Sequence, residues 1–166
     1  MKSKSFIYVL LFIIVIGIAS CTKSNTMILN TKVSFNATLT GASETPPNSS
    51  TATGTAAFVY DNSTYILTGT VTFAGITPTG AHIHKGDVGV AGAIIFPLAG
   101  AGTITSPISF TSSVLDSTQR ADLLANMYYV NIHSAAFPGG EIRGQLIQEA
   151  SSATGGGTYM GGGTGY

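Results

Sequence analysis

Residues 33–40 have the sequence VSFNATLT, in which apolar and polar side chains alternate without a break. Successive side chains of a β-strand point to opposite faces, so this pattern is typical of a strand with one buried face. Residues 54–60 and 64–73 are rich in threonine, valine, tyrosine and phenylalanine, and the turn-forming residues 61–63 (DNS) separate them. We expect these two segments to form a β-hairpin.

Short strand-like segments continue through the rest of this region. Further strands are predicted at residues 81–84, 93–98, 108–111, 128–133 and 141–147. One segment differs, because Asp116 is followed three residues later by Gln119, a pattern that resembles a helix capping box. A short helix is therefore expected over residues 117–126, with an apolar stripe formed by Leu115, Leu123 and Leu124. About eight short strands with frequent turns indicate an all-β fold, either an antiparallel β-sandwich or a Greek-key barrel, with one short helix.

The chain is poor in charge. Its 166 residues include 7 Lys+Arg and 7 Asp+Glu, and only 8% of residues are charged, against about a quarter in typical soluble domains. A nucleic-acid-binding domain usually has a basic surplus, so no nucleic-acid partner is expected. The single cysteine excludes a disulfide framework within the chain. The length suits one domain with its own hydrophobic core.

The N-terminal segment differs from the rest of the chain. Lys2 and Lys4 precede an apolar run over residues 6–18, which is 13 residues long. A membrane-spanning helix needs about 20 such residues. A basic start followed by a short apolar run is typical of a secretory signal peptide, which we place at residues 1–20.

Two small residues, Ala19 and Ser20, lie directly before Cys21, and this arrangement resembles the lipobox of bacterial lipoproteins. The resemblance implies that Cys21 becomes the lipidated N-terminus, with residues 21–31 as a tether to the membrane. No aspartate follows Cys21, and similarity to enterobacterial lipoproteins then favours the outer membrane of the cell envelope. An ordinary signal peptide with an incidental cysteine is the alternative.

The C-terminal segment, residues 150–166, is expected to be a flexible tail, since seven of residues 151–166 are glycine. The folded domain is therefore expected over residues 32–149. Removal of the signal peptide also removes Lys2 and Lys4, which leaves 5 basic and 7 acidic residues.

All three histidines lie in two predicted strands. His82 and His84 are two residues apart and so share a strand face, as do Asn131 and His133. Neutral imidazole is a common ligand of copper and zinc, so His82, His84 and His133 form a candidate metal site. One shared ion would bring their ring nitrogens within about 3–4.5 Å of one another, given metal–nitrogen distances of about 2.0–2.1 Å.

Two other hypotheses remain open. In the first, Glu44, Asn131, Glu141 and Arg143 form a structural polar network that hydrogen-bonds the histidines and holds the loops. In the second, a histidine acts as general base with Glu141 or Glu44 as its partner. The chain lacks the G-x-S-x-G signature of a serine nucleophile, so we expect a non-enzymatic protein more than an enzyme.

Four motifs occur in a distinctive order: ETPP at residues 44–47, AHIHKG at 81–86, YVNIH at 129–133 and PGGEIRGQL at 138–146. In this order they resemble the CHRD domain family, named for the chordins, and the resemblance extends from residue 33 to residue 147. It implies an all-β extracytoplasmic module and carries no particular activity. We therefore interpret the chain as a membrane-anchored binding or structural module of the cell envelope.

The histidine pattern is also loosely similar to the copper–zinc superoxide dismutases. In that comparison His82 and His84 match an H-x-H pair, and His133 matches a later copper ligand. The chain lacks the histidine-rich zinc loop and the disulfide cysteines of those enzymes, which argues against dismutase activity. The alternative function is therefore a copper- or zinc-binding protein with a superoxide-dismutase-like β-sandwich site.

Overall fold

The computed structural model describes residues 31–99 and 102–150. The expected signal peptide, Cys21, nearly all of the tether and the glycine-rich tail after residue 150 lie outside the described residues. No helix in the described ranges is long and apolar enough to cross a membrane.

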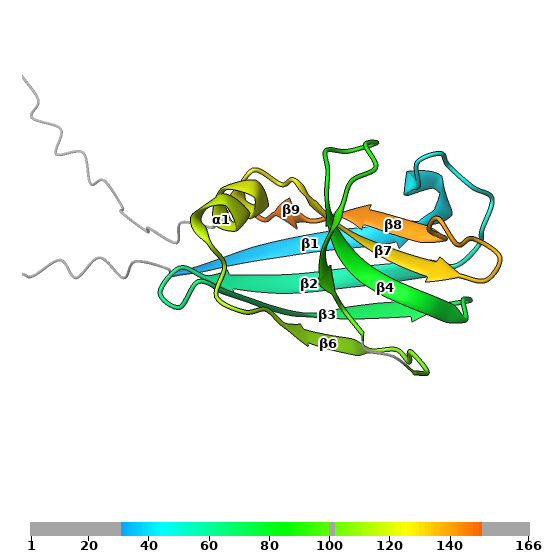
Figure 1. The fold of residues 1–166 in the computed structure, drawn as a ribbon, viewed down its shortest axis with the longest axis horizontal. Helices are drawn as coiled ribbons and strands as arrows, with labels where there is room; N and C mark the ends of the chain where they lie inside the picture. The colour runs from blue at the N-terminus through cyan, green and yellow to red at the C-terminus, as the bar shows by residue number, and fades with distance from the viewer. Residues whose placement is uncertain (1–30, 100–101, 151–166) are drawn as a thin grey trace, which may run out of the picture.

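The described chain forms one curled antiparallel sheet with one short α-helix (Figure 1). The strands follow the order β5-β4-β7-β8-β1-β2-β3-β6 across the sheet, and β9 pairs with β1. This confirms the expected all-β antiparallel fold with one short helix, and it shows that the strands belong to a single sheet. The elements are β1 (Lys32–Thr40), η1 (Gly41–Ser43), β2 (Thr53–Asp61), β3 (Ile66–Ala74), β4 (Pro78–Lys85), β5 (Ile94–Pro97), β6 (Ile108–Thr111), α1 (Ser117–Leu124), β7 (Tyr128–Ser134), β8 (Ile142–Gln145) and β9 (Ile147–Gln148).

The hydrophobic core lies on the inner face of the curled sheet. In β1, Phe35 and Leu39 are fully buried, and Phe35 pairs with Phe58 of the expected β2–β3 hairpin. The two edge strands approach each other, because the rings of Phe96 in β5 and Phe110 in β6 lie 5.7 Å apart. Strands β5 and β6 lie at opposite edges of the sheet, so this ring contact means that the sheet curls around these apolar side chains.

The helix begins as expected and ends early. Asp116 accepts a hydrogen bond from the backbone of Gln119, whose side chain accepts one from the Asp116 backbone, so the capping box is present. Helix α1 ends at Leu124, and Asn126 has a left-handed φ of 59°, typical of the residue after a helix. Leu123 is buried, but Leu124 is 41% exposed, so the prediction that Leu124 belongs to the apolar stripe was wrong. Adjacent helix residues point about 100° apart, which turns Leu124 away from the core.

The expected strand over residues 141–147 is divided. Strand β8 pairs with both β7 and β1, whereas β9 pairs with β1 alone. Between them the backbone amide of Leu146 donates to the carbonyl of Tyr128, and its side chain is fully buried. The single long strand was therefore wrong, because the chain leaves β7 after Leu146 and continues beside β1.

Candidate metal centre

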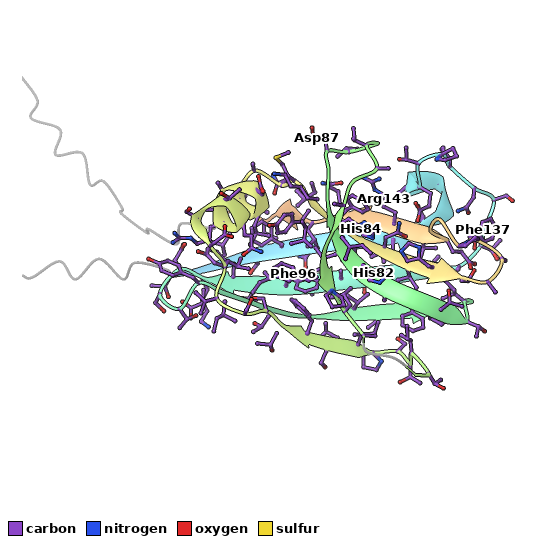
Figure 2. All side chains as sticks on the ribbon, viewed as in Figure 1. His82, His84, Asp87, Phe96, Phe137 and Arg143 are labelled. Atoms are coloured by element: carbon purple, nitrogen blue, oxygen red, sulfur yellow. The ribbon has the colours of Figure 1, made fainter. Side chains whose placement is uncertain are left out.

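Strands β4 and β7 are neighbours, and each places alternate side chains on opposite faces of the sheet. Ile83 of β4 and Val130 of β7 are fully buried in the core. The histidines on either side of Ile83 therefore point to the outer face, where Figure 2 labels His82 and His84. His133 joins them from β7, opposite Gly80.

The three imidazoles form a compact cluster. Their ring centroids lie 5.6 Å apart for His82 and His84, 5.1 Å for His82 and His133, and 5.9 Å for His84 and His133. Each residue offers one ring nitrogen, and these nitrogens all lie within 4.8 Å of one another. That limit is slightly wider than the expected range of about 3–4.5 Å for one shared ion. Small inward rotations of the rings would close the difference.

Gly80 makes room for this cluster. A Cβ atom at this position would lie 3.1 Å from Cε1 of His82 and 3.7 Å from Cδ2 of His133. The first distance is tighter than an ordinary van der Waals contact. The absence of a side chain at Gly80 therefore lets imidazoles from two strands meet on one face.

Backbone carbonyls determine which nitrogen of two rings carries the proton. Nδ1 of His84 lies 3.0 Å from the carbonyl of Gly92, and Nδ1 of His133 lies 3.1 Å from that of Pro138. A carbonyl oxygen only accepts hydrogen bonds, so each Nδ1 donates, and each neutral ring keeps a lone pair on Nε2. Histidines that ligate metals commonly hold their other nitrogen in this way.

Each ring also has a buried nitrogen that lacks a hydrogen-bond partner among the described residues. These atoms are Nδ1 of His82, Nε2 of His84 and Nε2 of His133. Leaving a buried polar atom unpaired costs about 1–3 kcal/mol, and such atoms in folded proteins usually indicate a missing partner. One ion coordinated by the three rings would pair them together.

The environment of His82 and His84 favours the neutral imidazole, which is the form that binds metals. Burial lowers the pKa of His82, and the neighbouring His133 and His84 lower it further. Burial also lowers the pKa of His84; the hydrogen bond to Gly92 opposes this change, while the charges of His133 and Arg143 add to it. A proton on one ring is thus disfavoured by its neighbours.

A second layer of contacts lies against His84. Its ring stacks on Tyr129, with centroids 5.0 Å apart and planes 12° apart. The guanidinium carbon of Arg143 lies 3.5 Å from the centre of the same tyrosine ring. Nη2 of Arg143 donates to the carbonyls of Asp87 (2.9 Å) and Val90 (3.0 Å), so this residue holds the 86–92 loop that supplies the carbonyl bound by His84.

The other residues of the expected polar network lie on the same side of the sheet, in separate contacts. Glu141 accepts a hydrogen bond of 2.6 Å from Ser50. Glu44 Oε1 and Asn131 Oδ1 lie 2.6 Å and 2.7 Å from the position a Cβ would take on Gly140, and burial raises the pKa of Glu44. The hydrogen bonds of His84 and His133 go to backbone carbonyls, so in the described ranges these side chains do not supply the histidines' partners. A structural role for the network stays a prediction.

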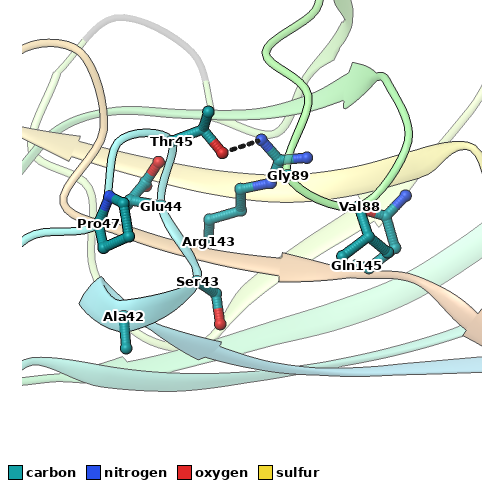
Figure 3. Close-up of a pocket in the computed structure, with 9 residues that line it drawn as sticks. All are labelled: Ala42, Ser43, Glu44, Thr45, Pro47, Val88, Gly89, Arg143 and Gln145. Carbon is teal, nitrogen blue, oxygen red and sulfur yellow. Dashed lines mark hydrogen bonds between the residues drawn. The ribbon is translucent and has the colours of Figure 1, made fainter.

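A pocket of about 390 Å³ opens beside Arg143 (Figure 3). Glu44 and Gln145 line it, and Arg143 Nη1 donates to Thr45 Oγ1 at 3.4 Å. None of the three histidines lines this pocket. The structure therefore does not combine it with the cluster into one active-site cavity.

Two contributors to this site, Tyr129 and Gly80, were not predicted from the sequence. Tyr129 could have been found, because it lies two residues before Asn131 and so shares the face of that residue and His133. Gly80 carried no signal, since its importance depends on which strand becomes the neighbour of β4.

The curled antiparallel sheet and the polar cluster on its outer face define an all-β domain with a candidate ligand site built on rigid strands. The CHRD domain model matches residues 35–146, and the chain belongs to this family. The matched residues contain all three histidines, and a CHRD domain suggests a binding or structural module. No curated protein and no solved structure matches the chain.

Proposed function

We propose that this CHRD domain binds one copper or zinc ion through His82, His84 and His133, as a non-enzymatic module of the bacterial cell envelope. The observation that carries this proposal is the convergence of three buried imidazole nitrogens from two neighbouring strands, none of which has a hydrogen-bond partner in residues 31–99 and 102–150. Three neutral imidazoles are a donor set that suits both zinc and copper.

The hydrogen bonds favour a metal over a purely structural cluster. Most buried side-chain polar atoms in folded proteins have a hydrogen-bond partner, either protein or ordered water. Within the part of the chain that the structure describes, His84 and His133 form hydrogen bonds through Nδ1 alone, and both bonds go to backbone carbonyls. The lone pairs on Nε2 are left for a ligand that accepts electron density, which is what a metal ion does.

The test uses the full chain, purified in detergent without a histidine tag and stripped of metal by a chelator. Titration with copper and with zinc should show binding close to one ion per chain for at least one of them. His84→Ala and His133→Ala should abolish binding, because two ligands do not hold the ion. Ser43→Ala, an exposed position in η1, is the control and should bind as the parent does. Absence of binding in the parent, or unchanged binding in His84→Ala, would overturn the proposal.

Lipid anchoring is the second part of this proposal, and the sequence around Cys21 supports it. The expected order is a signal peptide over residues 1–20, a lipidated Cys21 and a short tether to the domain, with the outer membrane as its location. Cys21→Ala should move the protein from the membrane fraction to the soluble fraction and abolish incorporation of labelled palmitate. An unchanged membrane fraction would refute the anchor and leave the metal site unaffected.

A further inference from the structure

The guanidinium of Arg143 and the imidazole of His84 contact the same aromatic ring, that of Tyr129. Tyr129 contacts the His84 ring at 5.0 Å between centroids and the Arg143 guanidinium at 3.5 Å. Arg143 is only 3% exposed, and its charge does not vary with pH in the physiological range. Any ion bound by the histidines is therefore repelled by Arg143.

No carboxylate in the described ranges forms an ion pair with this charge. The hydrogen bonds of Arg143 go to the carbonyls of Asp87 and Val90 and to the hydroxyl of Thr45. The nearby cation Lys85 is paired with Asp122 at 2.7 Å. Glu44 lines the pocket beside Arg143; burial raises the pKa of its carboxyl, and a hydrogen bond from the Thr45 backbone and the charge of Arg143 oppose that change.

We propose that Arg143 makes the three-histidine site selective for monovalent copper over divalent copper and zinc. This inference rests on the proposed metal-binding function. The ligands are neutral, so they do not offset the charge of the ion. The repulsion from one fixed charge grows in proportion to the charge of the ion, so it costs a divalent ion twice as much binding free energy as a monovalent one.

The expected size follows from Coulomb's law. The guanidinium lies 3.5 Å from the tyrosine ring centre, and that centre lies 5.0 Å from the His84 ring, so the guanidinium is at most about 9 Å from the His84 ring. For an ion at a distance of about 9 Å, an effective dielectric constant of about 20 gives roughly 20-fold in affinity per unit of metal charge. Screening by water at the open side of the site makes this an upper bound.

The test compares the affinities of the full chain for Cu(I) and Zn(II), each measured by competition with a chromophoric chelator. Arg143→Met removes the charge and Arg143→Lys keeps it. The ratio of Cu(I) to Zn(II) affinity should fall up to roughly 20-fold in the methionine variant and stay near the parent value in the lysine variant. In the methionine variant the midpoint potential of bound copper should also fall, by 59 mV for each tenfold decrease in the ratio of Cu(I) to Cu(II) affinity.

A second pair of variants leaves Arg143 in place, in case its replacement prevents folding. Thr45 is exposed and its hydroxyl contacts Nη1 of Arg143, so Thr45→Glu puts a carboxylate against the guanidinium. This variant should shift the affinity ratio towards zinc, and the neutral control Thr45→Gln should not.

The outcomes separate this inference from the proposed function. If the parent binds neither ion, the proposed function fails. If the parent binds and the affinity ratio is the same in Arg143→Met, Arg143→Lys and Thr45→Glu, metal binding stands and the charge selectivity is refuted. An equal change in the methionine and lysine variants also refutes it, since geometry rather than charge would then be responsible.

Discussion

Acidification should destabilise the metal-free protein through its histidine cluster. The pKa of His82 and that of His84 lie below the ordinary value of 6.5 in the folded state, chiefly because of burial. The unfolded chain therefore binds more protons than the folded one as the pH falls below 6.5. The stabilisation is fully present above pH 6.5 and is lost as the pH falls towards the folded pKa values.

The structure sets the size of the effect through the number of histidines involved. Each additional proton bound by the unfolded state changes the free energy of unfolding by at most about 1.4 kcal/mol per pH unit, so two histidines give at most about 2.7 kcal/mol per pH unit. Exposure of the cluster to water on its outer side makes the measured slope smaller.

The assay is urea unfolding of the full chain between pH 7.5 and pH 5 with a chelator present, followed by circular dichroism. The reference is His82→Asn/His84→Asn, in which the amide at position 84 keeps a donor for the Gly92 carbonyl. Subtracting the two pH profiles removes the carboxylates that titrate in both proteins. Equal slopes below pH 6.5 in the parent and the double variant would refute the lowered pKa values of His82 and His84 in the folded state.

Three further substitutions test the fold and the site. Gly80→Ala should weaken metal binding while the domain stays folded, since its Cβ would lie 3.1 Å from Cε1 of His82; equal affinity in a metal titration would contradict this. Gly69→Ala should lower the free energy of unfolding by roughly 1–3 kcal/mol, because its Cβ would lie 2.5 Å from a backbone oxygen of β2, whereas Gly139→Ala meets no atom within 4 Å and is the control in urea unfolding. Asp116→Ala removes the capping box and should cost about 1 kcal/mol in the same measurement; an unchanged midpoint would show that α1 does not depend on its cap.

The secondary structure could be predicted where one face of a segment is buried. The alternation in residues 33–40 corresponds to β1, in which Phe35 and Leu39 are fully buried. The capping box placed the start of α1 correctly, because it depends only on residues close in the chain. The end of the helix and the division of the last strand were missed, since both depend on contacts with distant segments.

The site could be predicted in part. A spacing of two residues places His82 and His84 on one strand face, and this holds for any strand. The pairing of Gly80 in β4 with His133 in β7 has no local signal, since the two residues are far apart in the chain. The contact between Arg143 and Tyr129 has the same origin, because it requires β8 to lie beside β7.

The sequence by itself determined most of the strands, the strand face on which His82 and His84 lie, and the scarcity of charge that made the histidines and Arg143 stand out. Each of these properties depends on a residue and its near neighbours along the chain. Only the tertiary structure decided that three imidazoles meet over Gly80, that carbonyls of Gly92 and Pro138 direct two lone pairs inward, and that a guanidinium lies one ring away. These properties depend on which strands pair, and pairing is determined by the burial of the whole core rather than by any one segment.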